Sequence, residues 1–204
     1  ERIIIDSQGK IFDYPVKSIG SLHNSSIEYV YIPNSVETIS TDFNGCTNLK
    51  YIHIADGGNS IYVDKVSADC PLETVYIGRD LRNNFGSHFA DNHNIKYLYW
   101  GPRTSVVGFD ADGSYKFCGD NAECNVIFLG DEQSGKLTIK SCSDLSKIKH
   151  YYVNRNITGN CHTEENTGLY DACETVEFGP FVTTIEEKSF GSVNRNKPLK
   201  FVDF

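Results

Sequence analysis

The sequence predicts an elongated β-solenoid, in which short parallel strands of successive turns stack side by side. Two observations lead to this fold class. An apolar motif, typified by Leu49-x-x-Ile52-x-Ile54, recurs along the chain, and its alternating end is typical of a strand with one buried face. The chain also lacks any long apolar run at 3.6-residue spacing, so we expect little helix.

The clearest repeat unit is IPNSVETISTDFNGCTNLKYIHI, residues 32–54. Its second half reads as a turn that leads into a short strand. Its first half carries Val36, Ile39 and Phe43 at wider spacing, and we expect a return path of loops, short strands or single helical turns behind the strand. One such unit cannot bury its own apolar face, so it requires a stacked copy on each side.

Copies of the strand motif follow at intervals close to the ~20–29 residues of a solenoid repeat. The copies after Trp100 are more widely spaced, so we expect a less regular C-terminal half. The predicted strand endings are Ile27-x-x-Val30-x-Ile32, Leu49-x-x-Ile52-x-Ile54, Leu72-x-x-Val75-x-Ile77, Ile95-x-x-Leu98-x-Trp100, Cys124-x-x-Ile127-x-Leu129, Leu145-x-x-Ile148, Cys173-x-x-Val176-x-Phe178 and Leu199-x-x-Val202-x-Phe204.

The unit at 32–54 resembles the BspA-like leucine-rich repeat, which reads roughly I-P-x-x-V-x-x-I-x-x-x-(A)F-x-x-C-x-x-L-x-x-I-x-I. Asp42 stands where that family usually has Ala. A second good match is Phe89-x-x-Asn92-x-x-Ile95, a third is Cys142-x-x-Leu145-x-x-Ile148, and residues 180–190 restate the first half of the unit. The matching positions are Ile32, Pro33, Val36, Ile39, Phe43, Cys46, Leu49, Ile52 and Ile54.

This resemblance covers about residues 25 to 204. It implies a β-rich, right-handed solenoid of the α/β leucine-rich-repeat class, with one curved parallel sheet and few helices. It also implies a secreted or surface-displayed protein used for adhesion or protein binding, without catalytic machinery. We expect one elongated domain, with residues 27–204 as the solenoid and residues 1–26 as an N-terminal partial repeat or cap. Because the sequence contains no Met, we also expect a processed product or a fragment of a longer protein.

Composition excludes some classes of partner. The formal net charge is −8 and the isoelectric point is near 5.2. An acidic chain is poorly suited to nucleic-acid backbones or anionic membranes, so we expect neither as the principal partner. No apolar run approaches the ~18–20 residues of a membrane-spanning helix, and we expect no membrane insertion of this segment.

Motifs for catalysis and for cofactors are missing. The chain has no Gly-x-Ser-x-Gly, no phosphate-binding glycine loop and no His-Glu-x-x-His. We therefore predict no enzyme, no catalytic residue and no cofactor. The insertion at 109–124 contains Asp110-x-Asp112-Gly113, but its glycine is two positions too early for an EF-hand loop, so we predict a solvated turn and no metal.

The seven cysteines divide into two groups. Five fall at or next to apolar positions of the repeats, where a free thiol packs as a small hydrophobe. These are Cys46, Cys70, Cys124, Cys142 and Cys173. Cys118 and Cys161 lie outside the repeat pattern, and the sequence leaves open whether Cys118–Cys124 or Cys161–Cys173 disulfides form.

The outward face of the predicted sheet is rich in tyrosine. Residues between the two core positions of each strand, and residues one step before them, should point away from the core. Stacked in register, they give two aromatic columns across about four repeats. Tyrosine combines a large contact area with a polar hydroxyl, which suits a binding surface. The predicted ligand-binding residues are Tyr29, Tyr31, Tyr51, His53, Tyr76, Tyr97, Tyr99 and Phe128.

Three functions fit this face. The first is an extracellular or cell-surface module for adhesion or protein recognition, with an extracellular or host protein as partner. The second is a carbohydrate-binding module in which the same aromatics stack on sugar rings. The third is a structural spacer, because cross-strand aromatic pairs stabilise a sheet by ~0.2–1 kcal/mol each without any ligand. Asn24-Ser25-Ser26 and Asn156-Ile157-Thr158 are glycan-acceptor motifs in a eukaryotic secretory pathway.

Overall fold

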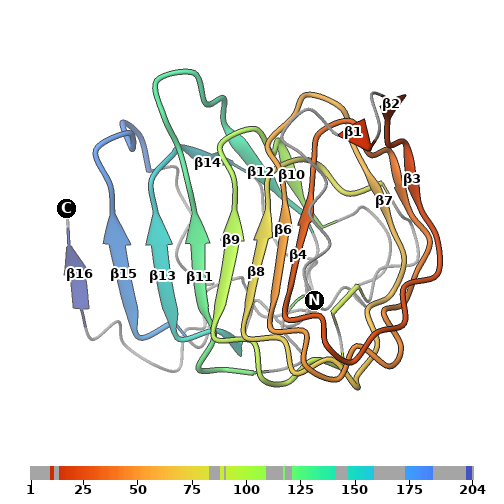
Figure 1. The fold of residues 1–204 in the computed structure, drawn as a ribbon. Helices are drawn as coiled ribbons and strands as arrows, with labels where there is room; N and C mark the ends of the chain where they lie inside the picture. The colour runs from red at the N-terminus through yellow and green to blue at the C-terminus, as the bar shows by residue number, and fades with distance from the viewer. Residues whose placement is uncertain are drawn as a thin grey trace.

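A computed structural model describes residues 10–11, 14–82, 88–89, 91–108, 117, 121–140, 147–158, 173–185 and 201–203. These residues form a parallel β-solenoid, as the repeat pattern predicts. Strands of successive turns lie side by side in one broad sheet, and the chain returns behind it (Figure 1). No α-helix occurs in the described part of the chain.

Within the described residues the broad sheet holds eight strands in the order β16-β15-β13-β11-β9-β8-β6-β4, and every neighbouring pair is parallel. Equivalent motif residues pair across it, so Val30 lies opposite Ile52, and Ile52 opposite Val75. The strands are β4 (Tyr29–Ile32), β6 (Tyr51–Ile54), β8 (Thr74–Ile77), β9 (Tyr97–Trp100), β11 (Asn125–Phe128), β13 (His150–Val153), β15 (Thr175–Phe178) and β16 (Phe201–Asp203).

The return path forms two narrower parallel sheets, so the expectation of a single sheet was incomplete. Main-chain groups of the return segments pair with those of the next turn because buried N–H and C=O groups need partners. One sheet joins β3 (Ser18–Ile19), β5 (Thr38–Ile39) and β7 (Tyr62–Val63); the other joins β10 (Val106–Val107), β12 (Leu137–Ile139) and β14 (Ile157–Thr158). An antiparallel pair, β1 (Lys10–Ile11) and β2 (Tyr14–Pro15), precedes them.

The apolar core fills the space between the broad sheet and the return path. Each turn contributes alternate side chains of its broad-sheet strand, such as Ile52 and Ile54, and one or two from the return strand, such as Ile39. The single tryptophan, Trp100, is buried and meets the Phe117 ring edge-on at 4.9 Å between centroids. The core is therefore continuous along the solenoid, as stacked repeats require.

A row of Cys and Asn side chains ties each turn to the one before it. All four are donors to a main-chain carbonyl of the preceding turn, which satisfies a polar group inside the core. The bonds run from Cys46 Sγ to Leu22 O (3.3 Å), Cys70 Sγ to Phe43 O (3.4 Å), Asn92 Nδ2 to Val66 O (3.2 Å) and Asn121 Nδ2 to Ile95 O (2.8 Å). Burial raises the pKa of the Cys70 thiol to about 12, so it stays a neutral donor.

Two buried arginines connect turns that are not neighbours. Arg79, only 1% exposed, donates to Pro33 O and Asn34 O. Arg155 is also buried and donates to Thr104 O at 2.9 Å and to Gly135 O. Burial lowers the pKa of both guanidinium groups, yet each keeps at least two carbonyl acceptors.

The predicted register is wrong in the fifth and sixth copies of the strand motif. In β9 one residue, Lys96, separates the buried Ile95 from the strand, whereas Cys124 is followed directly by β11. Because this residue is missing, the alternation of inward and outward side chains is shifted by one position. Val126 and Phe128 therefore face the core, instead of the predicted Ile127 and Leu129.

The sequence prediction places the sixth copy of the strand motif too early in the chain. Ile148 is the buried residue before the strand, and β13 follows it with Tyr151 and Val153 inside. Leu145 lies outside the described residues.

The structure also bears on the cysteines. Cys124 and Cys173 are both buried, as expected for cysteines at apolar positions of the repeats. Cys118, Cys142 and Cys161 lie outside the described residues, as does the Asp110–Asp112 segment of the insertion.

Candidate binding face of the broad sheet

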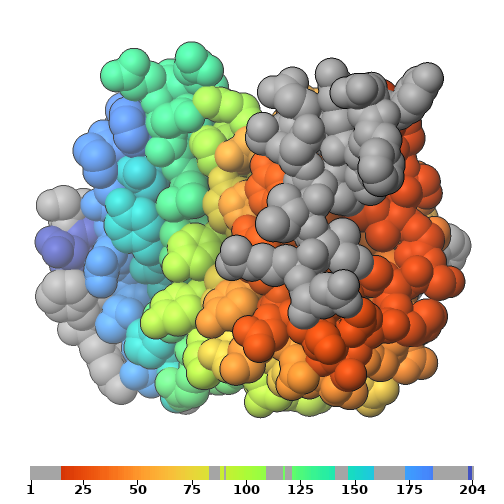
Figure 2. All heavy atoms as spheres, in the orientation of Figure 1, coloured from red at the N-terminus to blue at the C-terminus, as the bar shows by residue number. Residues whose placement is uncertain are grey.

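Four adjacent strands, β4, β6, β8 and β9, place aromatic side chains on the outer side of the broad sheet. Alternation along each strand sends every second residue outward, and parallel pairing without offset aligns these residues across the strands. The outward face of the sheet is turned to the viewer in Figure 1, and in Figure 2 the turns from β9 to β15 appear as parallel bands, yellow-green to blue. We call Tyr29, Tyr31, Tyr51, His53, Tyr76, Tyr97 and Tyr99 the aromatic face.

One column of the aromatic face is closely stacked. The His53 ring lies 5.1 Å from the Tyr31 ring and 4.3 Å from the Tyr76 ring, and its plane is within 8° of the latter. Tyr99 continues the column at 6.3 Å from Tyr76. Burial lowers the pKa of His53, against an opposing effect of Asp56, so its ring is uncharged at neutral pH. We call these four residues the stacked column.

A carboxylate holds the hydroxyl of Tyr76. This hydroxyl donates to Asp56, with both carboxylate oxygens at 3.0 Å. Burial raises the pKa of Tyr76, and the charge of Asp56 raises it further, so the phenol remains a neutral donor. A Cβ at Gly101 would collide with this pair, which explains a glycine directly after β9.

The other column is interrupted. Tyr29 and Tyr51 lie 6.4 Å apart on β4 and β6, but Thr74 occupies the next position, and Tyr97 follows on β9. Tyr51 and Tyr97 are 41% and 45% exposed. The small side chain of Thr74 therefore leaves a gap between two exposed rings, which we call the Thr74 notch.

Charged residues of alternating sign run along the strand starts. Each precedes its strand by one or two residues, so glutamate and lysine alternate from one strand to the next. Lys96 Nζ lies 2.9 Å from Glu73 Oε2, Lys149 pairs with Glu123, and Lys50 also lowers the pKa of Glu73 after the larger effect of Lys96. The members of this charged rim are Glu28, Lys50, Glu73, Lys96, Glu123, Lys149 and Glu174.

Phe128 does not belong to the binding face. The structure places it in the core with no exposed surface, because of the shifted register of β11. The outward residues of β11 are Asn125 and Ile127, opposite Tyr97 and Tyr99. The other seven predicted residues all lie on the outer side.

Two outward residues of β13 were missed by the sequence reading. His150 and Tyr152 lie opposite Asn125 and Ile127, and the His150 ring is 2.8 Å from Thr175 Oγ1. The spacing Ile148-x-x-Tyr151-x-Val153 would have identified the strand if a tyrosine had been accepted at a core position. Beyond Tyr152 the row continues as Glu177 and Asp203, so aromatic character fades toward the C-terminus.

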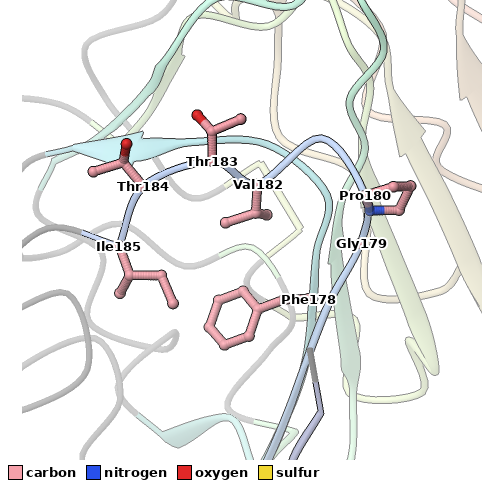
Figure 3. Close-up of a pocket in the computed structure, with 7 residues that line it drawn as sticks. All are labelled: Phe178, Gly179, Pro180, Val182, Thr183, Thr184 and Ile185. Atoms are coloured by element: carbon pink, nitrogen blue, oxygen red, sulfur yellow. The ribbon is translucent and has the colours of Figure 1, made fainter.

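An apolar pocket of about 670 Å³ lies at the C-terminal end, away from the aromatic face. Phe178, Val182 and Ile185 point into the same space, while Thr183 and Thr184 point away from it (Figure 3). Asn156 holds this segment to the preceding turn, since its Oδ1 accepts bonds from the N–H groups of Thr183 and Thr184. The pocket carries no charged side chain among its described lining residues.

The two glycan-acceptor motifs differ in their surroundings. Asn24 Oδ1 accepts only a local bond from the Ser26 N–H in a turn. The side-chain nitrogen of Asn156 donates to Thr183 Oγ1 at 2.8 Å, in addition to the bonds of its oxygen. A glycan at Asn156 would therefore break contacts between turns.

Two other kinds of feature are absent from the described residues. Among them no group of three or more His, Cys, Asp or Glu side chains could hold a metal ion. No helix in this part of the chain is long and apolar enough to cross a membrane.

Comparison with known proteins agrees with the geometry. Residues 18–111 match the family described as BspA type Leucine rich repeat region, in six copies. No curated protein and no solved structure matches the chain. The matched region contains β4, β6, β8 and β9, which carry the whole aromatic face. The resemblance is thus confirmed over residues 18–111, and this chain carries a BspA-type leucine-rich repeat region.

Proposed function

We propose that this protein is a non-enzymatic recognition module, secreted or displayed on a cell surface, that binds another extracellular protein through the aromatic face. BspA-type repeats are typical of surface proteins, and leucine-rich repeats in general bind proteins. The observation that carries the proposal is the gathering of seven ring side chains from four adjacent strands on the outer side of one sheet. Contiguous exposed patches of this kind mark interaction sites.

Protein recognition fits this face better than sugar recognition. The stacked column leaves little room between its rings, because His53 already lies 4.3 Å from Tyr76. The face is also bordered by the charged rim, and a polar rim around an aromatic centre is typical of protein interfaces. Sugar binding instead favours separate rings that each stack on one saccharide. Carbohydrate therefore stands as the second candidate ligand.

The test uses a variant with both exposed rings removed, Tyr51→Ala with Tyr97→Ala. These side chains are 41% and 45% exposed and meet the rings of Tyr29 and Tyr99 at 6.4 Å and 6.3 Å, so the variant should keep its circular dichroism spectrum and lose mainly contact area. A matched control is Phe181→Ala, which removes a ring 37% exposed at the C-terminal end. Wild type and both variants are measured against purified matrix proteins, secreted glycoproteins and a glycan array.

The expected result is a protein ligand whose affinity falls at least about tenfold in the double variant, equivalent to about 1.4 kcal/mol, and is unchanged in the control. A glycan ligand lost in the same way would favour the carbohydrate alternative. A ligand bound equally by all three proteins would move the site away from the aromatic face. Binding of nothing by the wild type would favour the structural spacer.

A further inference from the structure

Within the proposed binding function, we infer that the Thr74 notch receives one aromatic side chain from an acidic segment of the protein partner. This inference rests on the proposed function and specifies both the position of the main contact and the chemistry of the partner.

The size of the notch fits one ring. Tyr51 and Tyr97 lie on the strands to either side of Thr74, so their backbones are two strand spacings, about 9.6 Å, apart. With rings spaced as their backbones are, a ring placed midway would lie about 4.8 Å from each, within the ~4.5–7 Å between centroids at which aromatic pairs attract. Thr74 forms the floor, and Tyr76, two residues further along β8, closes one end.

Other places on the aromatic face do not offer such a gap. In the stacked column, the two contacts of His53 at 5.1 Å and 4.3 Å fill the spaces beside it. Tyr29 and Tyr51 occupy neighbouring strands at 6.4 Å, which is too close for a third ring. Among the described residues of the face, the notch is the place where an aromatic row is broken between two exposed rings.

The charges at the mouth of the notch favour an acidic partner. Lys50, Glu73 and Lys96 precede Tyr51, Thr74 and Tyr97 in the charged rim, so two lysines stand beside one glutamate. Lys96 Nζ lies 2.9 Å from Glu73 Oε2, so these two charges offset each other, while the lysine side chain stays 61% exposed. Counting Lys50, Glu73 and Lys96, the mouth therefore carries one net positive charge, that of Lys50, on a chain of net charge −8.

The decisive variant fills the notch. Thr74→Tyr completes the row between Tyr51 and Tyr97, and tyrosine is favoured in strands, so the variant should be at least as stable as the wild type. Thr175→Tyr makes the same change at the equivalent position of β15, outside the aromatic face, and serves as control. Thermal unfolding of both variants verifies that they fold.

The probe is an acetylated, amidated peptide, Asp-Glu-Trp-Glu-Asp, followed by saturation-transfer NMR. The comparison probes are the same peptide with Ala for Trp, a version with Lys at the four acidic positions, and methyl β-glucoside. We expect saturation of the indole protons with the wild type and the Thr175→Tyr control. We expect a loss of at least about fivefold with Thr74→Tyr and with the Lys peptide.

Other outcomes overturn the inference in distinguishable ways. Binding that is lost in the Tyr51→Ala, Tyr97→Ala variant but kept in Thr74→Tyr would reject the notch and leave the aromatic face as the site. Stronger saturation of methyl β-glucoside than of the indole would reject the aromatic anchor. Equal binding of the acidic and Lys peptides would reject the charge preference. No saturation of the indole by the wild type would reject the notch, whether or not the ligand screen finds a protein for the face.

Discussion

The guanidinium of Arg79 donates a hydrogen bond of 2.9 Å to the carbonyl oxygen of Pro33, 46 residues earlier in the chain. A second bond, of 2.8 Å, reaches Asn34 O. Pro33 follows β4 and Arg79 follows β8, so the side chain passes the intervening turn of β6. Contacts in a solenoid usually join neighbouring turns, and this side chain extends the connection to the next but one.

Replacing Arg79 should strongly destabilise the fold. Arg79→Met keeps much of the volume but removes the guanidinium donors to the buried carbonyl of Pro33 and the partly buried carbonyl of Asn34, and we expect a loss of about 2–4 kcal/mol. The measurement is urea unfolding followed by circular dichroism. The control is Arg82→Met, since Arg82 is exposed and makes a single carbonyl bond of 3.2 Å. Equal midpoints for the two variants would contradict a stabilising role for Arg79.

The effect of a Cys46 substitution on stability should depend on whether the new side chain can donate a hydrogen bond. Asn92 and Asn121 already make the equivalent bond elsewhere in the row, so Cys46→Asn should stay within about 1 kcal/mol of the wild type. Cys46→Val removes the donor to Leu22 O and should cost about 1–3 kcal/mol. Urea midpoints rank the three proteins. A valine variant more stable than the asparagine variant would show that the row acts by packing alone.

Acid should destabilise the protein through His88. Burial lowers the pKa of this histidine from its ordinary 6.5 to about 4. At pH 7 the ring is neutral in both states; below pH 6.5 only the unfolded chain takes up the proton, until the folded state follows near pH 4. The free energy of unfolding should therefore fall by about 3 kcal/mol across this window through His88 alone.

The pH effect can be isolated with His88→Gln, which has no titrating ring. The quantity to follow is the free energy of unfolding of the wild type minus that of the variant, measured by urea unfolding at several pH values. It should fall by about 3 kcal/mol as the pH falls from about 7 to 4. His23→Gln is the control, because His23 is exposed. A difference that is constant with pH would mean that His88 is protonated equally in both states.

Reversing one charge of the charged rim should lower the unfolding temperature mainly at low salt. Glu73→Lys would place three lysines in sequence, with Lys50 and Lys96 on either side. We expect a lower unfolding temperature at low ionic strength and recovery toward the wild type near 1 M NaCl, where the Debye length is about 3 Å. Glu132→Lys makes the same charge change at an exposed residue outside the rim. An identical shift in both variants would point to net charge rather than to pairing.

The strands that the sequence predicted correctly are those with an undisturbed repeat. From β4 to β9, three buried residues recur at one constant spacing, the first just before the strand and the other two within it. Leu49, Ile52 and Ile54 are an example. The alternation then determines which side chains face outward, and the aromatic face followed from it. In β11 a single missing residue reversed the assignment of Phe128.

Other features depend on proximity that spacing alone does not reveal. The bonds of Arg79 join residues two turns apart, and nothing in the local pattern distinguishes it from an exposed arginine. The Thr74 notch required knowledge of exposure, since Tyr51 and Tyr97 are no different in sequence from Tyr31 and Tyr76. The alternation of Glu and Lys is visible in the sequence, at the residues that precede each strand. Which of these charges are neighbours is known only from the register of the strands.

The charged rim limits how such a solenoid can change in length. Removing the single turn that carries Glu73 would place Lys50 beside Lys96, whereas removing two consecutive turns would again put a glutamate beside a lysine. Duplication of one turn meets the same repulsion, and duplication of two avoids it. Within this row of charges, the unit that can be gained or lost without penalty is therefore a pair of repeats.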